Sequence, residues 1–478
     1  ENILRKMGRV LETEELHKES LKIDPLYDRQ PEKINHNTLL ELMIDLYEAG
    51  DYAQGIALAK KWVEQQNVSR QEDIYPLVYY YIAYGYQNLH RKENTKQTNH
   101  YMTAYVTLGE NAVADGCFPH RTEDYIVLKS LADDYYLDMV YYYLGCLLYD
   151  RRAYGEAIAD YEEAALRYPD FPTVHRNLAL AYYNVKKQPQ RAYEEMEKAF
   201  ALDETDARVY LELDQLKKRL NVPVKERWSD MEKHFDLVES RDDLYLEYVT
   251  LLNTLGESEK ALNLIKARKF HQWEGGEGKV AAQYLTALYQ LAKAAAAEGE
   301  YVEAKTILLQ AVDEYPQNLG EGKLESAQEN NLYYLLGLAQ EKLGETEEAF
   351  VNLTKACHGE SEPVGMMYYN DQPPEMIFYQ GLAYRKLGNE EQAVRRFRKL
   401  VEYGREHIEE NVKIDYFAVS LPDLLIFEEN LDERNRKHCL FMMSLGLKGL
   451  GRSDEAEKCA EELLAMDNAH QGIRVHDL

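Results

Sequence analysis

The sequence predicts an all-α fold, a right-handed α-solenoid in which helical hairpins of one size stack into a superhelix. Apolar residues recur with helical spacing in paired segments, and small residues occupy matching places in each pair. The pattern also returns after about 34 residues, a period typical of repeat architectures. Units of this kind bury their apolar surface only against their neighbours, so the period itself indicates a solenoid.

The clearest unit covers residues 138–171. Gly145 and Ala157 allow its two antiparallel helices to approach closely, because larger side chains would hold the backbones apart. Pro169 then ends the second helix. Residues with helical spacing form the apolar face of each half: Tyr141, Leu144, Gly145 and Leu148, then Ala157, Tyr161, Ala164 and Ala165. The unit resembles a tetratricopeptide repeat, with Tyr141 where that repeat usually carries a tryptophan.

Further copies of this unit occur on both sides of it. They are marked by small residues at matching places, among them Gly50, Ala192, Gly256, Ala292, Gly337, Gly381 and Gly451. We therefore predict a single solenoid over residues 1–478, with no internal domain boundary. It has irregular hairpins over 1–135, regular repeats over 136–205, and repeats with inserted loops over 206–470.

Four irregular segments interrupt the repeats, at residues 269–279, 315–326, 358–375 and 412–435. Three glycines within four residues of the first segment cannot continue a helix, since each costs about 1 kcal/mol relative to alanine. Loops of a solenoid usually project from one edge, and insertions there often form the binding face. We therefore expect the function to depend on these interruptions.

Composition excludes several classes of partner. A formal net charge of −28 argues against nucleic acid and against anionic membrane surfaces, which both demand basic surface. Solvated helix faces explain the acidity better than a dedicated cationic partner does, and the basic runs 217–219 and 395–399 are interpreted as solvated faces too. No stretch of eighteen apolar residues and no signal-peptide core occurs.

The five cysteines have neither CxxC nor metal-type spacing, which suits a reducing compartment. We expect a cytoplasmic protein without a metal or another cofactor. The chain starts without methionine, and residues 1–25 end in the way a repeat's second helix ends. It is therefore expected to be part of a longer protein.

The first candidate binding residues lie in the loop 269–279. Carboxylates at Glu274 and Glu277 could hold a hard cation or sugar hydroxyls, with His271 beside them and Trp273 stacked on a sugar face. The favoured alternative is a tight glycine turn with Trp273 packed between hairpins and solvated carboxylates. Glu321 stands in a second Gly-Glu-Gly, so both loops are expected to line one edge. A phosphate-binding loop is rejected, because the segment follows a helix and lacks the required Ser or Thr.

Two further segments carry weaker candidates. In the turn before residue 122, His120 could act as a general base and Arg121 as an anion clamp. A helix cap with Thr122 as N-cap and Asp124 in the first turn is favoured over that role. Tyr416 belongs to the segment 416–423, within the irregular segment 412–435. Ser420 of this segment lacks a nucleophile elbow and more simply separates two helices.

The chain contains 39 tyrosines. Three in succession on a helix, as at 79–81 and 141–143, point about 100 degrees apart, so at least one must face away from its own hairpin. They could line a groove that binds peptide or carbohydrate, although ordinary packing between helices is the favoured interpretation.

Outside the repeats, the irregular segments resemble a bacterial family. Segments that carry the resemblance include GCFPHRTEDYIVL at 116–128, KFHQWEGGEGKV at 269–280, NLGEGKL at 318–324 and IDYFAVSLPDLLIFEENLDERNRKHC at 414–439. Members of that family join an N-terminal domain of unknown function, predicted to be β-rich, to a long tetratricopeptide array. The resemblance implies that this chain is the helical portion and that the β-rich domain is missing. It transfers no catalytic residue.

The sequence therefore favours a non-catalytic protein–protein interaction scaffold. Its concave groove would dock its own missing N-terminal domain or a peptide partner. The alternative is an accessory contribution to a carbohydrate-active site shared with the missing domain. Convergence of His271, Glu274, Glu277 and Glu321 on one cleft would favour that alternative.

Overall fold

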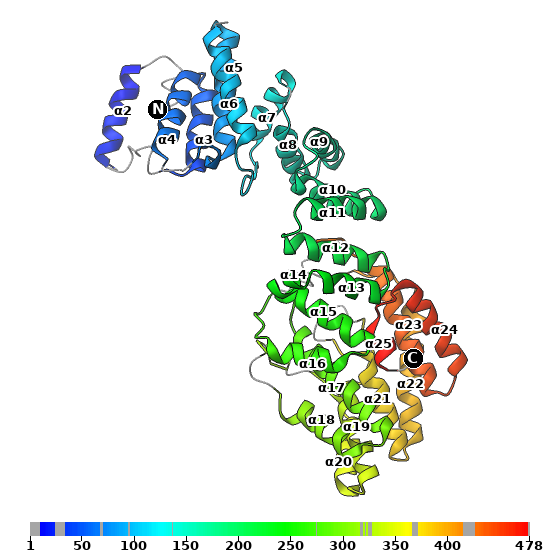
Figure 1. Cartoon of the computed structure of the whole chain (residues 1–478). Coiled ribbons are helices and arrows are strands. Elements are labelled where there is room, and N and C mark those ends of the chain that lie inside the picture. Colours follow the sequence, from blue (N-terminus) through cyan, green and yellow to red (C-terminus); the bar gives the residue numbers. More distant parts are fainter. Residues whose placement is uncertain are drawn as a thin grey trace. The chain divides into compact units, whose positions relative to one another are not determined.

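The computed structural model of the chain describes residues 10–23, 34–66, 70–93, 96–135, 137–273, 275–315, 319–320, 322–323, 327–365, 371–413 and 426–476. These residues form helices joined by turns and loops, and no strand occurs among them (Figure 1). By its internal packing the chain divides into two compact units, residues 1–181 (unit 1) and residues 182–478 (unit 2). The expectation of one continuous array across both units stays a prediction.

Unit 1 consists of helical hairpins. Its described helices are α2 (Val10–Ile23), α3 (His36–Glu48), α4 (Tyr52–Gln65), the short 3-10 helix η2 (Gln71–Asp73), α5 (Pro76–Glu93), α6 (Lys96–Asn111), α7 (Thr122–Asp134), α8 (Met139–Asp150), α9 (Tyr154–Arg167) and most of α10 (Pro172–Asn184). Helices α3 and α4, α5 and α6, and α8 and α9 pack as pairs, and α5 also packs on α3 and α7. This is the neighbour-on-neighbour packing expected of a solenoid.

Unit 2 continues the same construction. Its further helices are α11 (Pro189–Leu202), α12 (Ala207–Arg219), α13 (Val224–Lys233), α14 (Phe235–Ser240), α15 (Asp242–Leu255), α16 (Ser258–Ala267), α17 (Lys279–Glu298), α18 (Tyr301–Asp313), α19 (Asn330–Leu343), α20 (Thr346–Ala356), α21 (Pro374–Lys386), α22 (Glu390–His407), α23 (Leu431–Gly449), α24 (Ser453–Met466) and α25 (Gln471–Val475). The first helices of successive hairpins, α15, α17, α19, α21 and α23, pack in series. The predicted α-solenoid of helical hairpins is confirmed.

The small residues of the repeat work as predicted. A Cβ atom on Gly145 would lie 2.5 Å from the ring of Tyr161, and one on Gly381 would lie 2.5 Å from the ring of Phe397. In each case the large side chain of the second helix rests directly on the glycine of the first. Substituting either glycine would therefore force the two helices of that hairpin apart.

The consecutive tyrosines are packing residues. Tyr79, Tyr80 and Tyr81 are all at most 1% exposed, and they point to different partners. The hydroxyl of Tyr79 donates to the Gln71 carbonyl at 2.9 Å, while that of Tyr81 donates to the Asp124 carboxylate at 2.7 Å. The three directions predicted from helix geometry are confirmed, and for this cluster packing is the correct interpretation.

Unit 2 is closed by its last segment. Helix α25 packs on α15, and Phe441 of α23 contacts both His470 and Gly472 next to it. The amine of Lys293 on α17 donates to the Val475 carbonyl at 2.9 Å. The segment 467–476 thus lies against first helices that are far apart in the sequence, α15, α17 and α23 (Figure 1).

Among the described residues, no helix combines the length and the apolar character needed to cross a membrane.

Candidate functional site

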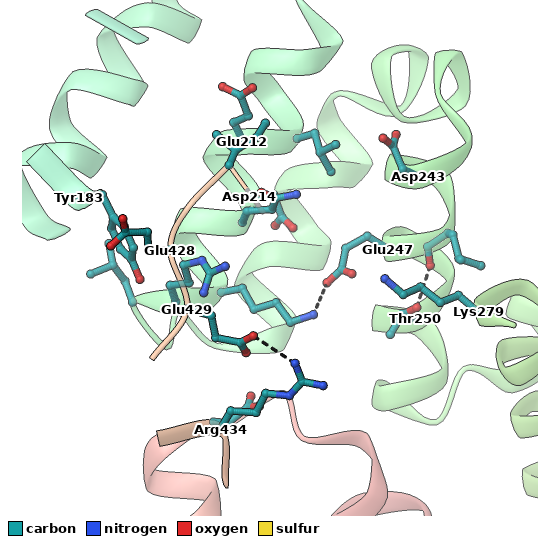
Figure 2. A pocket seen from close by; sticks show the side chains of 18 of the residues that line it. Tyr183, Glu212, Asp214, Asp243, Glu247, Thr250, Lys279, Glu428, Glu429 and Arg434 are labelled. Carbon is teal, nitrogen blue, oxygen red and sulfur yellow. Dashed lines mark hydrogen bonds and ion pairs between the residues drawn. The ribbon is translucent and has the colours of Figure 1, made fainter. Parts of the chain in front are cut away.

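A cavity of about 1340 Å³ lies within unit 2. Its wall is formed by the end of α10, by α12, α15 and the start of α17, and by residues 426–430 with the start of α23 (Figure 2). Two of the predicted interruptions contribute to it, since Trp273 comes from the loop 269–279 and Ile426 from the loop 412–435. Interruptions that lie far apart in the sequence therefore border one space.

Glycines position Trp273 at this cavity. The backbone N–H of Gly276 donates to the Trp273 carbonyl at 3.0 Å, which closes a tight turn. A Cβ atom on Gly276 would lie 2.3 Å from the indole ring, so only glycine lets the ring fold back over the turn. Gly275 has a φ of 80°, a backbone conformation that side chains disfavour. The tight glycine turn of the favoured sequence interpretation is confirmed. Trp273 packs on this turn and also lines the cavity.

The rest of the lining combines apolar and charged side chains. Basic residues are Lys187, Arg208, Lys218, Arg219, Arg241, Lys279, Arg434 and Lys437, and acidic residues are Glu212, Asp214, Asp243, Glu247, Glu428, Glu429, Glu433 and Asp467. There are eight of each, in a chain whose formal net charge is −28. The cavity is therefore much less acidic than the surface as a whole.

Most of these charges are paired, some within one helix and some between elements. The Lys218 amine lies 3.1 Å from the Glu247 carboxylate, and the Arg434 guanidinium lies 3.4 Å from that of Glu429 (Figure 2). Fixed pairs of this kind leave little excess charge to attract a highly charged ligand. They offer instead an alternating pattern that a segment with both signs of charge could match.

A buried ion cluster fixes the wall behind the cavity. The Arg227 guanidinium is 1% exposed and donates to Asp214 at 2.9 and 2.6 Å and to Glu247 at 2.7 Å. Although burial opposes it, the adjacent charges of Lys218 and Arg227 lower the pKa of Glu247 to about 2. The cluster links α12, α13 and α15, so the cavity is held on a rigid support.

The basic run 217–219 was wrongly interpreted as a solvated face. Lys217 is only 13% exposed and pairs with Asp230 at 2.6 Å, and Arg219 donates to the Phe427 carbonyl at 3.1 Å. Lys218 between them is 45% exposed, as a solvated face requires. The partner of Arg219 is 208 residues away in the sequence. Composition alone gives no signal of that burial.

The sequence candidates of the loop 269–279 do not gather at the cavity as a group. His271 is 88% exposed, and its backbone N–H and Nδ1 lie 2.7 and 3.0 Å from the carboxylate of Asp242. Although burial raises it, these hydrogen bonds and the adjacent Arg268 lower the pKa of Asp242. Glu277 is exposed, and Glu274 lies outside the described residues. Of this set, Trp273 lines the cavity.

The two glycine-rich loops do meet. A Cβ atom on Gly320 would lie 2.0 Å from the carbonyl oxygen of Phe270, so the second loop rests on the backbone of the first. The expectation that the loops share one edge is supported by this contact. Glu321 lies outside the described residues, as does Tyr416.

His120 and Arg121 belong to a helix cap in unit 1. The Asp124 carboxylate is fully buried and accepts the backbone N–H groups of His120 at 2.9 Å and Arg121 at 3.0 Å. The prediction of Thr122 as N-cap is wrong, since the N-cap is Arg121. Asp124 is the third residue of the helix, and its carboxylate accepts the backbone N–H of the N-cap, as in a capping box. The imidazole of His120 lies 3.1 Å from the Phe118 carbonyl, and Arg121 pairs with Glu41 at 3.3 Å.

No group of three or more His, Cys, Asp or Glu side chains is arranged to hold a metal ion within the described ranges.

Comparison with known proteins identifies the repeat. Models of the tetratricopeptide repeat match residues 142–207, 286–318, 331–357 and 375–403. Tetratricopeptide repeats are therefore present in both units, at hairpins that the sequence pattern marked. The β-rich domain and the bacterial origin implied by the family resemblance stay predictions.

Several solved structures are similar to parts of this chain at low sequence identity. The TPR domain of P58(IPK) is 14% identical to this chain, and the alignment covers 74% of this chain and 98% of that domain, with a TM-score of 0.23. Yeast Tom70 is 11% identical, and the alignment covers 99% of this chain and 94% of the Tom70 chain, with a TM-score of 0.32. A chain of the Naa15/Naa10 complex bound to HypK-THB is 12% identical, and the alignment covers 92% of this chain and 60% of that chain, with a TM-score of 0.29. The assignment of the repeats rests on the matched segments.

Proposed function

We propose that this chain is a non-catalytic scaffold that binds a segment of a partner protein in the cavity of unit 2. The observation that carries this proposal is the position of the cavity. Trp273 comes from one interruption and residues 426–430 come from another. Both border the same space together with α12, α15 and the start of α17. Repeats supply a rigid frame, and the inserted loops supply a surface that differs from the rest of the frame.

The chemistry of the cavity favours a peptide over a small charged ligand. Leu211, Leu246 and Met466 provide apolar surface, and Trp273 is the kind of aromatic residue that dominates binding energy at protein interfaces. The surrounding ion pairs can be exchanged with a ligand that carries both signs of charge, which gives specificity more than affinity. A domain N-terminal to this chain, expected from the family resemblance, could insert a loop in the same way.

The proposal is tested by selecting peptides from a random dodecapeptide library with the full chain as the target. Affinities of the recovered peptides are then measured for the wild type and for Trp273→Ala. We expect at least a tenfold loss, about 1.4 kcal/mol, because the indole is the largest apolar group on the cavity wall.

Phe350→Ala is the matched control, since Phe350 is an aromatic residue that is 61% exposed on α20 and does not line the cavity. It should leave the affinity unchanged. Peptides whose affinity is the same for Trp273→Ala and for the wild type would contradict the proposal.

A further inference from the structure

One stretch of the cavity wall is held as a bound peptide would be held. Residues 426–428 have no helical structure, and they run past the end of α10 next to Tyr183 (Figure 2). The side-chain amide of Asn184 donates to the Ile426 carbonyl at 2.9 Å and accepts the Glu428 N–H at 2.8 Å. A two-point contact of this kind recognises a peptide backbone whatever its side chains are.

The side chains of the same stretch have separate contacts. Phe427 is fully buried, with its ring 5.1 Å from that of Tyr183 in an edge-to-face arrangement, which is a favourable geometry for aromatic pairs. Its carbonyl accepts the Arg219 guanidinium at 3.1 Å. The Glu428 carboxylate pairs with the exposed Lys187 at 2.5 Å. Backbone, aromatic ring and carboxylate are thus each recognised by a different residue of α10, α12 or the turn between α10 and α11.

We infer that the ends of α10 and α12 form a binding site for an extended segment with an apolar, an aromatic and an acidic residue in succession. Residues 426–428 occupy this site within the chain, and a partner segment of the same chemistry replaces them. This inference rests on the proposed function and names the class of peptide that the cavity takes. The cavity beside residues 426–430 gives the incoming segment a place to enter.

The internal segment, residues 426–428, lowers the apparent affinity of the site for free peptides. A tethered segment competes at an effective concentration in the mM range, so a short peptide in solution displaces it poorly. A natural partner would need a second contact in the cavity, such as one with Trp273. Removing the internal aromatic side chain should therefore expose the full affinity of the site.

The test uses a fluorescein-labelled hexapeptide Ile-Phe-Glu-Glu-Asn-Leu, the sequence of residues 426–431, and fluorescence anisotropy with the full chain. We expect Phe427→Ala to bind it at least tenfold more tightly than the wild type. Adding Asn184→Ala to Phe427→Ala should weaken binding at least tenfold. The same peptide with alanine in place of phenylalanine should not bind.

Asn221→Ala, combined with Phe427→Ala, is the matched control. Asn221 makes a similar contact elsewhere in the unit, accepting the Asn468 N–H at 2.7 Å and donating to the Ala465 carbonyl at 3.0 Å. Its removal should leave the affinity for the hexapeptide unchanged. An equal loss for Asn184→Ala and Asn221→Ala would overturn the inference.

A second measurement covers the case in which Phe427→Ala unfolds unit 2. Hydrogen exchange of the wild type is measured with the hexapeptide at a concentration above the mM effective concentration of the internal segment. Under this condition the amides of residues 426–430 should exchange faster, because the peptide displaces them. Unchanged exchange would overturn the inference. Library peptides that bind in a Trp273-dependent way while the hexapeptide has no effect would leave the proposed function standing and remove this inference alone.

Discussion

Two irregular segments, the turn before α7 in unit 1 and residues 426–430 in unit 2, have opposite consequences. At the turn before α7 of unit 1, the Asp124 carboxylate is fully buried and accepts hydrogen bonds from Tyr81, His120 and Arg121. At residues 426–430 of unit 2, the interruption forms the wall of a cavity. An irregular segment therefore does not by itself make a site in this chain. The difference between the two segments is that side chains of the same chain fill the space beside Asp124, whereas a cavity remains beside residues 426–430.

The largest expected effect concerns the support of the cavity. Arg227→Ala leaves the buried Asp214 without its partner, and removing one member of a buried ion pair typically costs about 3–5 kcal/mol. Urea denaturation followed by circular dichroism should show the loss in unit 2. Lys225→Ala, at an exposed position of the same helix, is the control and should change stability by less than about 0.5 kcal/mol.

The corresponding change in unit 1 should be smaller and should spare binding. Asp124→Ala removes an acceptor of three hydrogen bonds and leaves the Tyr81 hydroxyl without its partner, so we expect a loss of about 2–3 kcal/mol. The affinity of library-selected peptides for the variant should equal that for the wild type. Weakened binding by a variant that still folds would contradict the structural role assigned to this turn.

A pH effect should distinguish unit 2 further. Burial, opposed by a hydrogen bond to the Val364 carbonyl, lowers the pKa of His438 from 6.5 to about 4. The unfolded chain binds this proton more readily, so the contribution to stability is present above pH 6.5 and is lost as the pH falls toward 4. Between these limits the wild type should lose about 2 kcal/mol that His438→Gln does not lose. Parallel stability profiles for the two proteins in urea denaturation would contradict this expectation.

The smallest effect concerns the charges of the cavity. Lys279→Glu should slow association with the selected peptides about threefold, because rim charges act mainly on the rate of encounter. The difference should shrink at high salt. Lys342→Glu, on the exposed end of α19 outside the cavity lining, has the same charge change and should leave the rate unaltered in stopped-flow measurements.

The fold could be predicted because the signals for it are local. The spacing of Gly145 and Tyr161 places a large side chain on a small residue within one hairpin, and the structure contains that contact. Trp273 was found for the same reason, since adjacent glycines define its turn. The two other described candidates of that loop, His271 and Glu277, are exposed because neither takes part in packing that local turn.

The site could not be predicted because its contacts join distant segments. Asn184 and Ile426 are 242 residues apart, and no spacing rule connects them. The same holds for Arg219, whose basic neighbours suggested a solvated face. The contacts of the segment 467–476 are also long-range, since Lys293 and Val475 are 182 residues apart.

The central claim is that partner segments bind in the cavity of unit 2. Its most direct test is hydrogen exchange of the full chain with and without a peptide recovered from the library. We predict protection in α12, α15 and around Trp273, with no change in the helices of unit 1. Protection confined to unit 1, or spread over the second helices α18, α20 and α22 of the hairpins with none at the cavity, would contradict the claim.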